Sequence, residues 1–162
     1  MQQAIQRLIE DEIKRAREAA KQKKVPESKT LVLTPEAEAL SNTFATNRGK
    51  LPWPVVQGII TEHFGVHPHP LMPDVNVSSN GIDISTSRGS LARSVFDGEV
   101  TGVANIPGSG KVVIIRHGDY LSVYANLNEV YVKTGEKIKT KQNIGSLLFD
   151  DNDGKTELHL EI

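Results

Sequence analysis

The sequence contains no cysteine, which excludes disulfide bonds and thiolate metal sites. It shows no signal peptide and no apolar run long enough to cross a membrane, since Met1-Gln2-Gln3 leads straight into charged residues. Aromatic residues make up only 5% of the 162 residues, and the formal net charge is −1. These values favour neither a nucleic-acid partner nor an anionic membrane, because such partners select basic and aromatic surfaces.

The chain is long enough for one domain with a hydrophobic core and an additional helical segment. Residues 1–24 are rich in strong helix formers and predict an amphipathic helix. Its buried stripe is expected at three- and four-residue spacing: Ile5, Leu8, Ile9, Glu12, Ile13, Ala16 and Ala20. Such a helix either packs on its own domain or forms the end of a longer coiled coil, and the residues favour neither interpretation.

Residues 25–49 predict a linker followed by a second helix. The basic, proline-containing stretch 21–29 is typical of a solvated linker. Thr34 is expected to cap a helix whose first position is Pro35, because two acidic residues follow in the first turn. This helix is expected to run to about Asn47 and to end at Gly49.

From residue 50 to residue 162 the pattern changes to short apolar stretches separated by turn residues, which predicts a mainly β domain. Residues 66–75 are rich in proline and are expected to form a surface loop with little regular structure. A metal could use His63, His67 and His69 in this region, but solvated loop histidines are the more frequent case. The acidic stretch 150–154 lacks the bidentate glutamate of a calcium loop and favours a polar turn.

Two stretches alternate between polar and apolar residues. In Gly81-Ile82-Asp83-Ile84 the aspartate lies on the polar face, and the C-terminal stretch 157–162 has a polar face of its own: Glu157, His159 and Glu161. If the two strands pair in one sheet, Asp83 and His159 meet on a common polar surface. A carboxylate and an imidazole in such a position indicate a candidate functional site.

Together with Tyr124-Ala125-Asn126-Leu127, these stretches resemble the three motif strands of the LytM, or lysostaphin-like, zinc metallopeptidases. The resemblance implies an antiparallel β-sheet domain of the kind that cuts peptide crosslinks in bacterial peptidoglycan. The family pattern has one histidine four residues before the aspartate, one in the middle strand, and a His-x-His pair in the last strand. The first histidine, the aspartate and the final histidine hold the zinc, and the other two histidines assist the metal-bound water.

Carried over residue by residue, this pattern fails at three positions. Ser79 stands at the first ligand position, Asn126 at the middle histidine and Glu157 at the first histidine of the last pair, so only Asp83 and His159 match. A catalytic zinc needs three protein ligands and an open position, and neither serine nor asparagine replaces an imidazole as ligand or proton carrier. The resemblance therefore implies this fold without this chemistry, and no metal or other cofactor.

The run Asn47-Arg48-Gly49-Lys50-Leu51-Pro52-Trp53-Pro54-Val55 resembles the entry into the degenerate LytM domain of the EnvC-like murein hydrolase activators. That branch implies a non-enzymatic activator of N-acetylmuramoyl-L-alanine amidases in cell-wall splitting during division. It also implies a periplasmic or envelope location, an export signal outside this sequence, and a membrane division complex acting through an upstream coiled coil. The amidase is expected to bind the groove of the degenerate site: Ser79, Asp83, Tyr124, Asn126, Glu157 and His159.

Tyr124 is the expected anchor of this groove, because tyrosine is enriched among interface hot spots. One of the two helices, residues 3–22 or 34–47, is expected to lie over the groove and block it until it is released, and the sequence does not say which. Two other functions stay open. One is an atypical zinc metallopeptidase with Asp83, His159 and Glu157 as ligands, and the other is a cell-wall-binding module.

Overall fold

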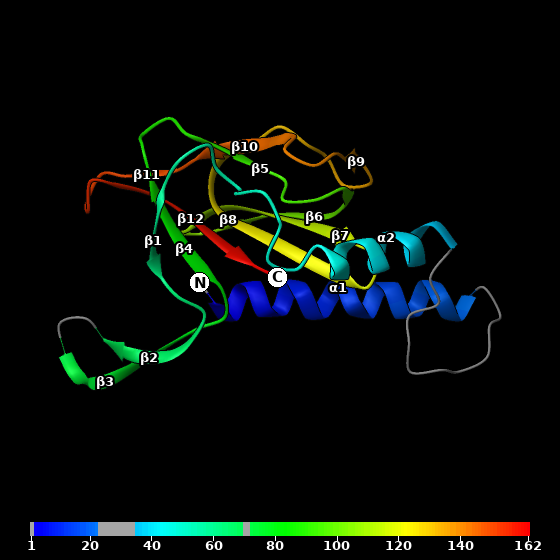
Figure 1. Cartoon of the computed structure of the whole chain (residues 1–162), viewed down its shortest axis with the longest axis horizontal. Helices are drawn as coiled ribbons and strands as arrows, with labels where there is room; N and C mark the ends of the chain where they lie inside the picture. Colours follow the sequence, from blue (N-terminus) through cyan, green and yellow to red (C-terminus); the bar gives the residue numbers. More distant parts are fainter. Residues whose placement is uncertain (1, 23–34, 70–71) are drawn as a thin grey trace.

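Two helices precede a mainly β domain in the computed structural model, which describes residues 2–22, 35–69 and 72–162 (Figure 1). Helix α1 spans Gln2–Gln22 and α2 spans Pro35–Thr46. Proline occupies the first position of α2, as expected, and Gly49 follows the helix with a φ of 76°. The expected cap Thr34 and most of the expected linker lie outside the described residues. Neither described helix combines the length and the apolar character that a bilayer crossing needs.

The β domain is built on a ten-stranded antiparallel sheet whose main path runs β1-β4-β12-β8-β7-β6-β9. Strand β10 pairs with β5 and β8, and β11 pairs with β12. This confirms the predicted mainly β class. The bounds of the ten strands are β1 Ile59–Glu62, β4 Ile82–Thr86, β5 Leu91–Arg93, β6 Gly98–Ile106, β7 Gly110–His117, β8 Tyr120–Val130, β9 Lys137–Ile138, β10 Asn143–Leu147, β11 Phe149–Asp150 and β12 Lys155–Glu161.

A separate hairpin projects from the body of the domain (Figure 1). It consists of β2, Gly65–His69, and β3, Met72–Ser79, which form a two-stranded sheet of their own. The prediction of an irregular loop over residues 66–75 was therefore wrong. Prolines are tolerated here because an isolated hairpin has outer edges, where a missing N–H breaks no ladder hydrogen bond.

The main sheet buries a different set of side chains on each face. One face and the layer of β5 and β10 enclose the larger core, which contains Ile84, Leu158 and Leu160. The other face lies under α1, and their contact is a smaller cluster of Ile5, Ile106, Val112, Ile114, Val123 and Ala125, flanked by Ala4, Leu8, Ile9 and Leu121. Ile5 is fully buried, which contributes roughly 2–3 kcal/mol by area. The structure thus favours the interpretation in which the first helix packs on its own domain.

Helix α2 lies at the far end of β7 and contacts a buried histidine. Phe44 of α2 is stacked on the ring of His117 with centroids 4.9 Å apart, and on the ring of Tyr120 at 5.0 Å. His117 is completely buried, with Nδ1 2.6 Å from the carbonyl oxygen of Asp97 and Nε2 2.7 Å from Oγ of Ser122. Burial lowers its pKa, although the carbonyl and charge of Asp97 oppose this, so His117 is a neutral core residue.

Candidate functional site

The paired strands β4, β12 and β8 bring the two matching motif residues together. In the antiparallel ladder, His159 of β12 lies directly opposite Asp83 of β4 on one side and Ala125 of β8 on the other. Residues opposite each other point to the same face of a sheet, so Asp83 and His159 share a face. Gly81 fixes the entry of β4, because a Cβ at this position would lie 2.2 Å from the carbonyl oxygen of Leu160.

His159 is held between two carboxylates. Its Nδ1–H donates to Oδ1 of Asp83 at 2.5 Å, and its Nε2–H donates to Oε1 of Glu161 at 3.0 Å. The His159 side chain is 2% exposed and that of Asp83 is 26% exposed. Burial alone would lower the pKa of His159, but the hydrogen bonds and charges of Asp83 and Glu161 outweigh it and raise the pKa to about 9. At neutral pH His159 is therefore an imidazolium.

Glu161 is a member of this cluster that was missing from the predicted site residues. It is 6% exposed and lies two residues beyond His159 in β12. The signal was present in the sequence, because the alternation of residues 157–162 places Glu161 on the His159 face. A carboxylate that accepts from the second ring nitrogen is also the usual support of a metal-binding histidine.

The remaining predicted residues surround the cluster at different depths. Glu157 is partly exposed on the same face of β12, where its Oε1 accepts a hydrogen bond from Oγ1 of Thr61 at 3.2 Å. Asn126 directly follows Ala125, is partly exposed, and has a φ of 64°. Ser79 is 4% exposed at the end of β3, and its Oγ donates to the carbonyl oxygen of Gly81 at 3.0 Å.

The prediction that Tyr124 anchors a partner in the groove was wrong. Its side chain is fully buried in the larger core, on the face of the sheet opposite to His159. Its hydroxyl accepts a hydrogen bond from the N–H of Val95 at 3.0 Å and lies 3.3 Å from Oγ of Ser122. Burial raises the pKa of Tyr124, so the hydroxyl stays protonated. Tyr124 is a structural residue.

Replacing Tyr124 with phenylalanine is accordingly expected to lower the free energy of unfolding by about 1–3 kcal/mol, because the buried N–H of Val95 loses its acceptor. Urea denaturation measures this loss. Partner affinity at temperatures where the variant is folded should match that of the wild type. A weaker partner interaction with unchanged stability would contradict this assignment.

The described donor set does not fit a catalytic zinc. Asp83 and Nδ1 of His159 could serve as ligands, but the third position holds Ser79, whose hydroxyl is occupied in the turn with Gly81. Within residues 2–22, 35–69 and 72–162, no group of three His, Cys, Asp or Glu side chains is placed to hold a metal ion. Asn126 and Glu157 replace the two histidines that would assist a metal-bound water. In this structure a proton on Nδ1 joins Asp83 to His159, where the family pattern has a metal.

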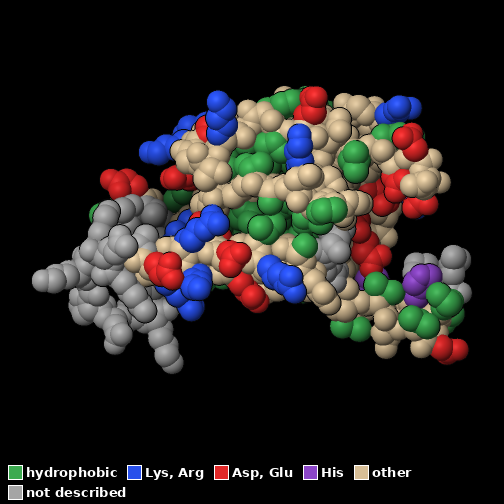
Figure 2. All heavy atoms as spheres, turned by 180° about the vertical axis from the view of Figure 1, so that it is seen from behind, with side chains coloured by type: hydrophobic (Ala, Val, Ile, Leu, Met, Phe, Trp, Pro, Cys, Tyr) green, Lys and Arg blue, Asp and Glu red, His purple; other side chains and the backbone are tan. Residues whose placement is uncertain are grey.

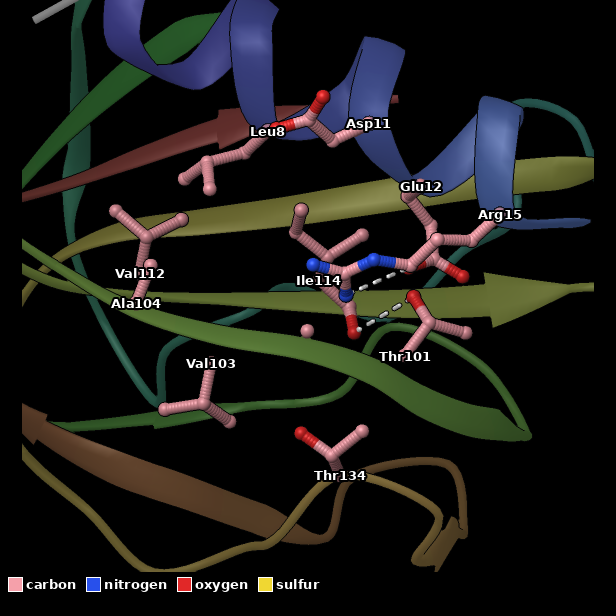
Figure 3. Close-up of a pocket in the computed structure, with 11 residues that line it drawn as sticks. Leu8, Asp11, Glu12, Arg15, Thr101, Val103, Ala104, Val112, Ile114 and Thr134 are labelled. Atoms are coloured by element: carbon pink, nitrogen blue, oxygen red, sulfur yellow. Dashed lines mark hydrogen bonds and ion pairs between the residues drawn. The ribbon is translucent and has the colours of Figure 1, made fainter.

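Helix α1 covers the sheet next to this cluster. Its fully buried Ile5 belongs to the same apolar cluster as Ala125, the neighbour of His159 across the strand pair. Further along the helix the packing opens into a groove of about 130 Å³ between α1 and strands β6 and β7. Figure 3 shows Leu8 at one end of this groove and the paired Glu12 and Arg15 at the other. The contact of α1 with the sheet is thus tight near the site and looser away from it.

A β-sheet of this order, with an aspartate and a histidine paired across adjacent strands, has the architecture of the LytM peptidases. Residues 77–162, just over half of the chain, match Peptidase family M23, and the chain belongs to that family. Csd3 of Helicobacter pylori has a similar structure, with a TM-score of 0.57 and 31% sequence identity over 68% of this chain and 30% of that chain. The predicted LytM fold is confirmed.

Relatives in sequence include both activators and enzymes. The chain is 30% identical over 139 residues to the murein hydrolase activator NlpD of Salmonella dublin, covering 85% of this chain and 34% of the relative. It is 26% identical over 136 residues to the cell division protein DipM of Caulobacter vibrioides, covering 83% and 21% respectively. It is 33% identical over 98 residues to the peptidoglycan DD-endopeptidase ShyA of Vibrio cholerae, covering 58% and 22%. The chain therefore spans between a fifth and about a third of the length of these relatives.

Proposed function

We propose that this domain is a non-catalytic activator of an N-acetylmuramoyl-L-alanine amidase, acting on peptidoglycan in the cell envelope. The observation that carries the proposal is the ligand set at the site. Asp83 and His159 are hydrogen-bonded directly to each other. The third ligand position is Ser79, whose hydroxyl donates a hydrogen bond to the carbonyl oxygen of Gly81. A site with two of three ligands and neither assisting histidine cannot activate water by the route that the family uses.

The proposed partner surface is the accessible part of the degenerate site. Asp83, Asn126 and Glu157 are partly exposed, whereas Ser79, His159 and Glu161 are buried and support them. Because Tyr124 is buried in the larger core and does not contribute to it, this surface is polar and acidic. It presents hydrogen-bonding groups on rigid strands, which suits recognition of a partner protein.

The similarity to NlpD and DipM supports this reading, because those relatives are a murein hydrolase activator and a cell division protein. By the same reasoning we place the domain in the periplasm or cell envelope. The coupling to a membrane division complex through an upstream coiled coil remains part of the proposal, since the described part of α1 packs on the sheet instead.

We further propose that α1 is the helix that restrains the partner surface. The reason is its position: α1 packs on the His159 face beside Ala125, whereas α2 contacts the far end of β7 through Phe44. A helix held mainly by Ile5, Leu8 and Ile9 can detach at a cost of a few kcal/mol, which is suitable for a switch.

The proposal is tested by an amidase assay on isolated cell-wall sacculi, with and without the protein, beside a zinc determination on the same preparation. We expect the amidase to release more fragments when the protein is present, while the protein alone releases none and holds far less than one zinc per chain. Crosslinks cut by the protein alone would establish a peptidase instead. Binding to sacculi with no effect on the amidase would establish a cell-wall-binding module.

A further inference from the structure

The β2–β3 hairpin projects from the main sheet and shares no strand ladder with it among the described residues, although His67 of β2 lies 2.8 Å from Oε1 of Glu62 in β1. Its two strands pair only with each other in the part of the chain that the structure describes. An isolated two-stranded hairpin is marginally stable in water, and hairpins usually gain their stability from a surface packed against them. A surface packed against the hairpin would therefore add to its stability.

Large apolar side chains are exposed on the hairpin and on the edge strand beside it. Phe64 at the entry to the hairpin is 72% exposed, Val66 of β2 is 71% exposed, and Met72 of β3 is 53% exposed. Ile59, on the free edge strand β1, is 68% exposed. Single exposed apolar residues are ordinary, but several on one projecting element and its neighbour mark an interaction surface.

The same end of the molecule is acidic. Segments 51–87 and 156–162 form β1 to β4 and most of β12, and they contain no lysine or arginine. They carry five carboxylates: Glu62, Asp74, Asp83, Glu157 and Glu161. None of the five forms an ion pair with a lysine or arginine among the described residues; two histidines lie close to three of them, His67 beside Glu62 and His159 beside Asp83 and Glu161. Figure 2 shows acidic side chains on the side from which the hairpin projects, and side chains of both charges along α1 and the upper body.

We propose that this hairpin end, defined as β1 with the β2–β3 hairpin, docks a basic amphipathic segment of a partner protein. Apolar side chains of the segment would cover Phe64, Val66 and Met72, and its lysines or arginines would face the exposed Asp74. The charge complementarity selects a basic segment over an acidic one, because like charges placed opposite each other across an interface cost binding energy. The inference extends the proposed function, since the hairpin end adjoins Glu157 through its hydrogen bond with Thr61.

The first test uses a defined probe rather than the unidentified partner. The probe is a helical peptide of about 18 residues with a leucine face and a lysine face, and its control has glutamate at every lysine position. In an NMR titration, the amides of β1, β2 and β3 are expected to shift with the lysine peptide alone. The paired substitutions Phe64→Ser and Val66→Ser, or Asp74→Lys, are expected to weaken binding about tenfold or more, and added salt should weaken it further.

Matched control substitutions lie elsewhere on the surface. Tyr131→Ser removes an aromatic side chain that is 51% exposed, and Asp151→Lys reverses an exposed charge in another loop. Both are expected to leave peptide binding unchanged. Equal binding of the two peptides, no binding of either, or equal losses in the control variants would overturn the inference.

A second arm separates this inference from the proposed function. If the wild type stimulates the amidase and the Phe64→Ser, Val66→Ser variant stimulates it equally, docking at the hairpin end is wrong and the activator function stands. If the lysine peptide binds as expected but the wild type does not stimulate the amidase, the activator function is wrong and the docking surface stands.

Discussion

Replacing His159 with leucine is expected to lower the free energy of unfolding by about 3 kcal/mol at neutral pH. His159 is 2% exposed and supplies the only positive charge that contacts Asp83 and Glu161 among the described residues. Removing it leaves two carboxylates on the same face of adjacent strands without the imidazole that donates to both. Removing one member of a buried charge cluster costs more free energy than the intact cluster contributes to stability, because the remaining charges stay desolvated and unpaired.

The control for this prediction is the variant that removes all three charges, Asp83→Asn with His159→Leu and Glu161→Gln. It should recover much of the stability lost in the single variant, since no uncompensated carboxylate remains. His63→Leu, at an exposed histidine of the same domain, should change stability by less than about 0.5 kcal/mol. A triple variant less stable than His159→Leu in urea denaturation would show that the cluster is not held together by charge.

The same cluster predicts the pH dependence of stability. The pKa of His159 is about 9 in the folded protein and about 6.5 in the unfolded chain, so its stabilisation is complete below pH 6.5 and declines as the pH rises through 9. The shift corresponds to about 3 kcal/mol in total. His117 acts in the opposite direction, because its lowered pKa means that stability is lost as the pH falls below about 6.5. Urea titrations across this range should show the alkaline decline in the wild type and not in His159→Leu.

If the domain activates an amidase as proposed and α1 restrains the partner surface, Ile5→Asp is expected to raise the potency of this stimulation about tenfold or more. Ile5 is fully buried against the sheet beside Ala125, so an aspartate there loses its apolar burial and introduces an unpaired charge. Each 1.4 kcal/mol of lost docking energy shifts the docked and released populations about tenfold. The concentration of protein that gives half-maximal stimulation of the amidase measures the effect.

Gln6→Asp is the matched control, because Gln6 is the next residue of α1 and is exposed. It introduces the same charge and should leave potency unchanged. Limited proteolysis of α1 shows whether Ile5→Asp has released the helix. If the helix is released and stimulation stays at the wild-type value, α1 does not restrain the site. Deletion of residues 1–46 should then also leave stimulation and partner affinity unchanged.

The alternation of polar and apolar residues was enough to predict the central contact of the site. Asp83 and His159 could be placed on one face because a shift of the strand pairing by one residue would turn the polar side chains of a strand into the core. The same rule failed for Tyr124, since β8 is buried on both faces and alternation does not say which face belongs to the site. Tyr124 was assigned to the groove for its residue type, whereas its hydroxyl completes a hydrogen-bond network in the core.

Tertiary contacts decided what local patterns left open. Nothing in the sequence says which of α1 and α2 lies on the site face, because the pattern of a helix does not show which strands it contacts. The docking of Ile5 against Val123 and Ala125 depends on strands more than a hundred residues away. The hairpin was missed for a different reason. Proline-rich sequence argues against a strand inside a sheet, and β2–β3 lies outside one.

The hydrogen-bonded pair of Asp83 and His159 also separates metal binding from hydrolysis among the positions that differ from the family pattern. Two ligands and their supporting Glu161 are retained, so a histidine at position 79 would complete the ligand set and let a metal compete with the proton on Nδ1. The family's route to hydrolysis would further require histidines at 126, in β8, and at 157, in β12. Metal capture and bond cleavage thus depend on separate positions, and a substitution at 79 alone would give a metal-stabilised binding protein without adding the two assisting histidines.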